Sequence, residues 1–254
     1  MLLGKDEPIP ANAINAGANG SPFVLIGDHA GRRVPARLGD LGLPHAELER
    51  HIGWDIGVAE LGAALAFLLD SPFISQVYSR LVIDCNRDPS RADSIVEISD
   101  GTTIPGNQAL SVEARAERVD EIFTPYHAAI GRALDEREDQ PTAVIAVHSF
   151  TPVFGGFVRP WRFGVLHRRD SPLSAAMLGV LRESEGEAVI GDNQPYAMDT
   201  VDYSIPHHCD ERGLDYLELE VRQDLIGSAD DAEAMAEHVA PLLIEALRRV
   251  ASQR

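Results

Sequence analysis

The sequence predicts a three-layer α/β fold, in which a mostly parallel mixed sheet carries helices on both faces. Short apolar runs alternate along the chain with longer segments of helical periodicity, the pattern of strands joined by crossover helices. The run at 143–147 is continuous and rich in β-branched residues, as expected of a central strand. We find neither an internal repeat nor a long linker. Residues 1–254 are therefore predicted to form one domain, with 1–20 as an irregular N-terminal arm.

Each predicted strand is an apolar or β-branched run that ends at polar residues. In chain order the strands cover 22–27, 73–78, 81–85, 143–147, 163–167 and 216–221. Helices are predicted where apolar residues recur every three or four positions, at 56–69, 119–134, 172–182 and 232–250, with a kink expected at Pro125. Two long polar segments, 88–108 and 191–212, are expected to form functional loops.

Composition and charge exclude several classes of protein. The 254 residues are 44% hydrophobic and 24% charged, which is typical of a chain that buries a core. A net charge of −18 argues against nucleic acid or a membrane surface as partner, because both recruit Lys and Arg. Cys85 and Cys209 form no CxxC motif, and the N-terminus lacks the features of a signal peptide. We expect a soluble, cytoplasmic protein with reduced cysteines; the pattern leaves the oligomeric state open.

Side chains able to perform chemistry gather where the predicted strands end. Ligands of such sheets bind beyond the carboxyl ends of the strands, so we expect these side chains to meet. They are Asp28, His29, Asp84, Asn86, Arg87, His148, Ser149, Glu218, Glu220 and Arg222. Two histidines, several carboxylates and arginines are the composition of a metal-assisted hydrolytic site. A catalytic zinc takes three protein ligands and activates a water in the fourth position.

Three other motifs are weaker candidates. The tract at 207–209 holds two histidines and a cysteine, but adjacent side chains diverge on a strand, so a second zinc site is not expected. Ser149 has no Gly-x-Ser-x-Gly turn around it, which argues against a serine nucleophile. The glycine-rich segment 101–106 lacks the Lys-Ser/Thr ending of a phosphate loop. We interpret it as a wall over the pocket.

Six ordered blocks carry a resemblance to a known family. They are DHAG at 28–31 with VP at 34–35, HIGWDIG at 51–57, SRLVIDCNR at 79–87, VHSFTP at 147–152, GDNQPY at 191–196 and LEVRQDL at 219–225. Over most of its length the chain resembles the N-formylglutamate amidohydrolase family. The resemblance implies a phosphorylase/hydrolase-like α/β domain similar to the zinc carboxypeptidases and aspartoacylases. It also implies one catalytic zinc and a small-molecule N-acyl amino acid as substrate.

The resemblance implies a metal ligand at His29. In the carboxypeptidase pattern a Glu follows the first His after three residues, but here Arg32 stands at that position and cannot bind a metal. We predict that Asp55 takes its place, with His51 and Asp28 as the alternatives. The predicted ion is Zn²⁺, although such ligands also accept manganese, iron or cobalt.

The third ligand and the general base follow from two later motifs. His-Ser-Phe at 148–150 and Glu-Val-Arg at 220–222 look like the last two elements of the carboxypeptidase pattern. The first motif implies His148 as a ligand, and the second implies Glu220 as the base. Glu218 lies on the same strand face, so it is the alternative base or a supporting carboxylate.

The remaining site residues are predicted to hold the substrate. Asn86-Arg87 resembles the Asn-Arg pair that binds a substrate carboxylate in carboxypeptidases, and a guanidinium suits a bidentate contact. Arg80 is predicted to polarise the scissile carbonyl; a salt bridge with Asp84 is the equally weighted alternative. Two further residues are predicted to line the pocket, Asn193 and Tyr196, although Asn-x-Pro is also ordinary turn chemistry.

The residues and the resemblance together predict a function. We expect a zinc-dependent amidohydrolase that cleaves the N-formyl, or another N-acyl, amide of an acidic amino acid such as N-formylglutamate. One alternative is an amidase or peptidase of the same fold with a different acyl or peptide substrate. The other is a metal-free binding protein that keeps the fold, which Arg32 at a usual ligand position favours.

Overall fold

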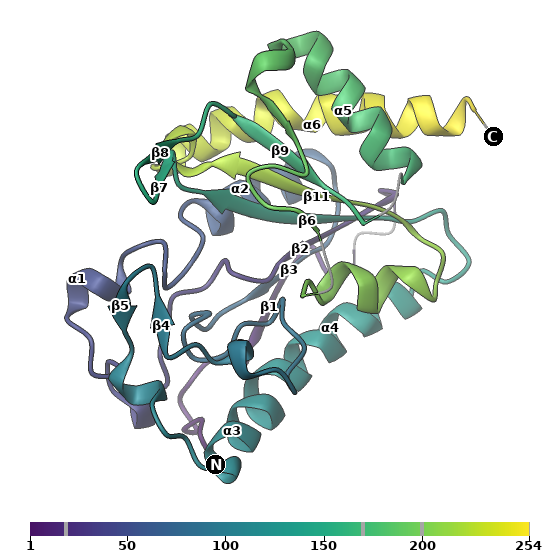
Figure 1. Ribbon diagram of the computed structural model, residues 1–254. Coiled ribbons are helices and arrows are strands. Elements are labelled where there is room, and N and C mark those ends of the chain that lie inside the picture. The colour runs from purple at the N-terminus through teal and green to yellow at the C-terminus, as the bar shows by residue number, and fades with distance from the viewer. Residues whose placement is uncertain (18–19, 169–170, 199–200, 254) are drawn as a thin grey trace.

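A seven-stranded sheet forms the centre of the computed structural model, which describes residues 1–17, 20–168, 171–198 and 201–253 (Figure 1). Its order is β1-β3-β2-β6-β11-β9-β10. The strands are β1 (Ala11–Ile14), β2 (Phe23–Gly27), β3 (Phe73–Gln76), β6 (Ala143–Phe150), β9 (Phe163–Leu166), β10 (Ile190–Asp192) and β11 (Asp215–Arg222). The four neighbours β3, β2, β6 and β11 run parallel, and β10 is parallel to β9. Only the β1–β3 and β11–β9 pairings of this sheet are antiparallel among the described residues, so the predicted mostly parallel sheet is confirmed.

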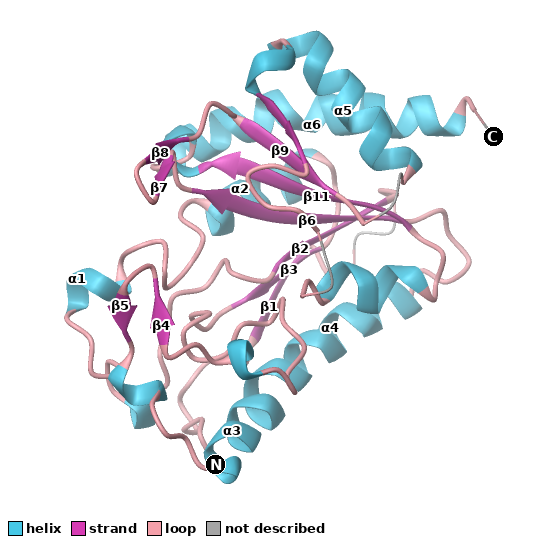
Figure 2. Cartoon of the chain, viewed as in Figure 1, coloured by secondary structure: helices cyan, strands magenta, loops and turns pink. Residues whose placement is uncertain are grey.

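Helices cover both faces of the sheet, as the sequence predicts (Figure 2). On one face lie α2 (Val58–Leu68) and α5 (Pro172–Glu185), and α6 (Ala229–Ala251) packs against both. On the other face α3 (Val112–Arg118) continues through a π-helical turn, 119–123, into α4 (Thr124–Asp135), which covers β1, β2 and β3. Ser171 and Ser228 cap α5 and α6, because their hydroxyls accept backbone N–H groups of the first turn. The three-layer architecture is confirmed.

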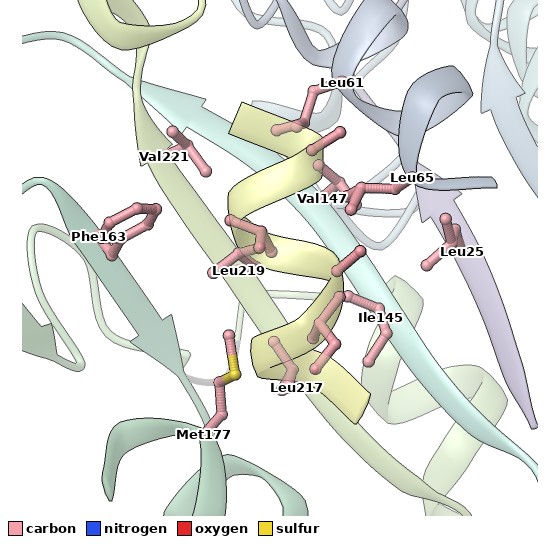
Figure 3. Close-up of a cluster of buried hydrophobic side chains, with 14 of the residues drawn as sticks. Leu25, Leu61, Leu65, Ile145, Val147, Phe163, Met177, Leu217, Leu219 and Val221 are labelled. Carbon is pink, nitrogen blue, oxygen red and sulfur yellow. The ribbon is translucent and has the colours of Figure 1, made fainter. Parts of the chain in front are cut away.

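Two hydrophobic cores fill the spaces between the layers. Alternate residues of a strand point to opposite faces, so Ile145 and Val147 pack beneath α2 and α6, while Val144 and Ala146 face the α4 side. Figure 3 shows the first core, in which these strand residues meet Leu61 and Leu65 of α2. The α4 side of β6 and β11 becomes polar toward the carboxyl ends of the strands. That change from apolar to polar side chains marks the position of the candidate site.

The segment 81–85, which the sequence predicts as a strand, is a series of turns. Its residues are consecutively buried because they lie beneath a loop layer, as the hydrogen bond from Asp84 N–H to Ser94 O shows at 2.7 Å. Val82 N–H bonds Ser79 O, a turn contact rather than a ladder contact. The apolar run at 81–85 therefore indicates that the segment is buried, but it does not indicate a strand. The strand predicted at 73–78 likewise ends at Gln76.

Two further expectations are corrected. The N-terminal arm is not irregular throughout, because β1 pairs with the edge of β3. The loop at 88–108 contains a hairpin of β4 (Ile98–Ser99) and β5 (Thr102–Thr103).

Pro125 lies inside the helical stretch that runs from α3 into α4. The π-helical turn at 119–123 comes just before it, so the helix departs from regular α-helical geometry next to this proline.

The remaining short elements lie on the same side as the candidate site. They are α1 (His45–Leu48) and the hairpin of β7 (Val153–Phe154) and β8 (Phe157–Val158). Residues 199–200 of the predicted loop 191–212 lie outside the described residues. Within the described part of the chain, no helix combines the length and the apolar character that crossing a bilayer requires.

Position 164 in β9 requires glycine because the turn at 194–196 lies very close to it. A Cβ at this position would stand 2.2 Å from the carbonyl oxygen of Gln194 and 3.2 Å from the Cβ of Glu220. Gly179 of α5 is different, because its nearest neighbour would be a guanidinium nitrogen at 3.8 Å. The two glycines therefore make a matched pair.

We expect Gly164→Ala to lower the free energy of unfolding by about 1–3 kcal/mol, because the added methyl group overpacks the turn. Gly179→Ala is expected to raise it by about 0.5–1 kcal/mol, because Ala favours a helix interior over Gly. Denaturant unfolding of the two variants measures both values. Equal stabilities would contradict the close approach at Gly164.

Candidate metal centre

A cavity of about 490 Å³ opens at the carboxyl ends of the parallel strands. Its wall includes residues that follow β2, residues of β6 and β11, and parts of the segments 80–100 and 196–202. It therefore lies where the topology of the sheet predicts a ligand site. Most of the residues selected from the sequence line it, namely His29, His51, Asp55, Arg80, Asn86, Arg87, His148, Tyr196, Glu218 and Glu220.

His29, Asp55 and His148 come together in this cavity, and all three are buried. Each offers one ligand atom, and these atoms lie within 4.8 Å of one another. Oδ2 of Asp55 is 3.0 Å from Nδ1 of His148 and 3.6 Å from Nδ1 of His29. The backbone sets this meeting, because Asp55 N–H donates to His29 O at 2.9 Å and Ser149 N–H donates to Asp55 Oδ2 at 3.2 Å.

A carboxylate stands behind each of the two imidazoles. Nε2 of His29 bonds Asp84 Oδ1 at 2.7 Å, and Nε2 of His148 lies 3.4 Å from Asp28 Oδ2. Asp28 also accepts the hydroxyl groups of Tyr126 and Ser204. Metal-binding histidines commonly have such a carboxylate on the nitrogen that faces away from the ion, which leaves both Nδ1 atoms directed at Asp55.

Neither sequence alternative for the second ligand belongs to the three-residue group. Asp28 lies behind His148, and His51 pairs with Asp100 at 3.5 Å on the cavity wall. Arg32, which stands at the usual ligand position, is directed outward, where it pairs with Glu49 and stacks on Trp54. The outward direction of Arg32 removes the observation that favoured a metal-free protein.

The residues present fit a divalent cation. Two buried polar atoms at this place, His29 Nδ1 and Glu220 Oε2, lack a hydrogen-bond partner within the described ranges. Asp28 Oδ2 and His148 Nε2 lack a hydrogen bond as well, but they face each other at 3.4 Å. Two imidazoles and a carboxylate are also the ligands that zinc prefers. Burial lowers the pKa of His148, but Glu218, Asp28 and Asp55 outweigh it and raise that pKa well above its ordinary value. Protons thus compensate the carboxylates where a cation would otherwise do so.

Glu220 and Glu218 occupy successive inward positions of β11. The register of β11 with β6 places Glu220 opposite His148 and Glu218 opposite Ala146. Burial raises the pKa of Glu220 to about 7, and its Oε2 is one of the two atoms without a hydrogen-bond partner named above. Burial also raises the pKa of Glu218 well above its ordinary value, and Glu218 Oε1 is 4.0 Å from His148 Nε2.

The arginines predicted to hold substrate already have partners inside the protein. Arg80 Nη2 bonds Asp84 Oδ2 at 2.6 Å, and its Nη1 lies 3.3 Å from Asp55 Oδ1. The salt bridge that the sequence offered as the alternative for Arg80 is therefore present. Arg87 Nη1 pairs with Asp202 Oδ1 at 3.3 Å. Burial lowers the pKa of Arg80, but the charges of Asp84 and Asp55 outweigh it and raise that pKa.

The carboxamide oxygens of Asn86 and Asn193 both accept hydrogen bonds from backbone N–H groups. Asn86 Oδ1 accepts the N–H groups of Tyr203 and Ser204, each at 2.9 Å. Asn193 Oδ1 accepts His167 N–H at 2.9 Å, and Asn193 is not among the residues that line the cavity. The turn interpretation of Asn193 thus describes its position better than the pocket interpretation does.

The histidine tract at 207–209 forms no metal-binding group with other residues that the structure describes. Among the described residues the group of His29, Asp55 and His148 is the one able to hold an ion. His208 Nε2 instead pairs with His127 Nδ1 at 3.0 Å in a buried ring cluster. Sequence reasoning missed Asp202 and Arg159, because neither stands in a motif; only the folded chain brings them to this site.

The comparisons with known proteins bear on what such a site does. Residues 21–227 match the family model described as N-formylglutamate amidohydrolase. This chain belongs to that family. The resemblance found in the sequence is therefore confirmed, and the family is one of hydrolases that act on amide bonds of small acyl amino acids.

Two solved structures are similar over nearly the whole chain. A gene product from Agrobacterium tumefaciens is 30% identical with a TM-score of 0.94, and the match covers 99% of this chain and 100% of the other. An N-formylglutamate amidohydrolase from Ralstonia eutropha is 19% identical with a TM-score of 0.66, covering 96% and 98%. The second likeness shows the fold alone. A comparison with curated proteins finds no match.

We expect Asp84→Asn to weaken Zn²⁺ binding by about 10- to 100-fold, because the carboxylate behind His29 fixes the imidazole and raises its basicity. Competition with a chromophoric chelator measures the affinity. Asp93→Asn is the matched control, since Asp93 also lines the cavity but pairs with Arg91. Unchanged affinity in Asp84→Asn would remove Asp84 from this role.

Proposed function

We propose that the protein is a zinc-dependent amidohydrolase that cleaves the N-formyl amide of an acidic amino acid such as N-formylglutamate. The family supports amide hydrolysis and a small acyl amino acid as substrate. The observation that carries the proposal is the convergence of His29, Asp55 and His148 beside the unpartnered carboxyl group of Glu220. A pair of imidazoles and a carboxylate next to a free base is the requirement of metal-assisted hydrolysis.

His29, Asp55 and His148 would hold the ion, with Asp84 and Asp28 fixing the two imidazoles. A zinc ion bound there supplies Lewis acidity, which lowers the pKa of a water to about 7 and polarises a carbonyl oxygen. A metal ion would compete with protons for the ring nitrogens of His29 and His148. The affinity for the ion is therefore expected to fall as the pH falls.

Glu220 acts as the general base. Glu220 lines the cavity, and its Oε2 has no hydrogen-bond partner among the described residues. It therefore accepts a proton from the attacking water and later passes it to the leaving amine. A pKa of about 7, raised by burial, suits both directions of this transfer near neutral pH. Glu218 lies deeper, beneath His148, and supports that imidazole.

The arginines handle the negative charge of the substrate and of the transition state. Arg80 lies next to Asp55 on the cavity wall, where its guanidinium stabilises the oxyanion that forms from the formyl carbonyl. Arg87 binds the α-carboxylate by exchanging it for Asp202, while Asn86 holds the segment that carries Asp202. Tyr196 also lines the cavity, and Asn193 fixes the turn before it.

The substrate experiment measures turnover of N-formylglutamate, N-acetylglutamate and a glutamyl dipeptide by the zinc-loaded protein. We expect the formyl compound to have the highest kcat/KM and activity to be lost on chelation and restored by Zn²⁺. A preference for the acetyl compound or the peptide would assign the protein another acyl group. Turnover that survives complete metal removal would contradict the mechanism.

We expect Glu220→Gln to lower kcat by about 10²- to 10⁴-fold while zinc stays bound, because the amide cannot accept the proton. Steady-state kinetics and metal analysis of the same sample measure both. Glu187→Gln, at an exposed glutamate outside the cavity, is the matched control. Full activity of Glu220→Gln would transfer the role of base to Glu218.

A further inference from the structure

Arg159 is a buried cation behind the wall of the cavity. It follows β8 directly and is only 5% exposed. Its Nη1 donates to the carbonyl oxygen and the hydroxyl of Thr151, at 3.2 and 3.0 Å. Arg159 stands in none of the sequence motifs, yet its partner Thr151 lines the cavity.

The charge of Arg159 has no counter-charge within the described ranges. Arg80 pairs with two aspartates and Arg87 with Asp202, but the hydrogen bonds of Arg159 go to neutral oxygens. The Tyr196 hydroxyl is a further neutral partner: burial raises the pKa of Tyr196, and Arg159 partly offsets that rise. A buried guanidinium without a carboxylate is costly, so a ligand anion at this place would recover free energy.

Two half-exposed rings of the cavity lining lie against the guanidinium. The Arg159 Cζ lies 4.8 Å from the ring centre of Tyr196 and 5.0 Å from that of Phe154. Both rings line the cavity and are 44% and 45% exposed. A guanidinium has five N–H groups. Both hydrogen bonds to Thr151 come from Nη1 and the Tyr196 hydroxyl takes one more, so N–H groups of Arg159 remain for an acceptor near the edge of these rings.

We propose that Arg159 binds the side-chain carboxylate of the substrate and so selects acidic over neutral amino acids. This inference rests on the proposed function, in which Arg87 already takes the α-carboxylate. The cavity is lined by many carboxylates, so a substrate with two negative charges needs a cation that the protein has not neutralised. A guanidinium offers a planar pair of N–H donors that matches a carboxylate.

The experiment compares N-formyl-L-glutamate with N-formyl-L-glutamine, which differ in the side-chain charge alone. We expect the wild-type kcat/KM to favour the glutamate compound by about 10- to 100-fold, the range of a charged hydrogen bond. Arg159→Met is expected to reduce this ratio below about threefold by lowering the glutamate value and sparing the glutamine value. Arg159→Lys, which keeps the charge without the planar fork, is expected to give an intermediate ratio.

Arg162→Met is the matched control. Arg162 lies three residues further along and pairs with Glu185 away from the cavity, so its removal should leave the ratio unchanged. An equal fall for both substrates in Arg159→Met would overturn the inference, because it would mean that Arg159 only holds the wall of the cavity. A wild-type ratio near one would overturn it as well.

A binding measurement separates this inference from the proposed function. Calorimetry with L-glutamate and L-glutamine does not require turnover, and we expect wild type, but not Arg159→Met, to bind L-glutamate at least tenfold more tightly. If wild type hydrolyses neither formyl compound, the proposed function fails, while the binding ratio still decides the role of Arg159. If Arg159→Met does not fold, the ratio of the affinities of Arg159→Lys for L-glutamate and L-glutamine tests the role of Arg159 instead.

Discussion

The contact of the Asp55 carboxylate with the imidazoles of His29 and His148 is the interaction on which the rest of this site depends. Asp55 Oδ2 lies 3.0 Å from one Nδ1 and 3.6 Å from the other, and it also accepts Ser149 N–H. Three segments far apart in the chain are joined at this one oxygen. Its position is backed by the bond from Asp55 N–H to His29 O, so the geometry does not depend on side chains alone.

A surplus of buried carboxylates explains the arrangement of the other charges. Asp28 and Asp84 stand behind the histidines, and Glu218 and Glu220 follow along β11. Buried carboxylates must be protonated, paired or bound to a cation, and the first two solutions appear here. The pKa of Glu218 is raised by burial, and Asp84 pairs with Arg80. The four atoms of this site without a hydrogen-bond partner among the described residues lie in the three-residue group or next to it. In the same way, Asp202 forms a salt bridge with Arg87.

Much of the fold was predictable because its strands are buried on both faces. The runs at 143–147 and 216–221 carry enough β-branched or apolar side chains to mark central strands, and both are strands in the structure. The same reasoning failed at 81–85, where a covering loop rather than neighbouring strands buries the residues. It also missed β1, a short edge strand whose two middle residues are exposed. An apolar run predicts that a segment is buried, but it does not show whether neighbouring strands or a covering loop bury it.

The motif blocks alone are enough to predict the family and the residue types available for chemistry, since they place His29, His148 and Glu220 at strand ends. They do not show which carboxylate joins the two histidines and which stand behind them, because Asp28, Asp55 and Asp84 all lie near strand ends or turns. The folded chain shows this. It also placed Asn193 in a turn and Arg159 behind the cavity wall. The physical reason is that pairing depends on distance and direction in space, and loops that fold over a sheet set both.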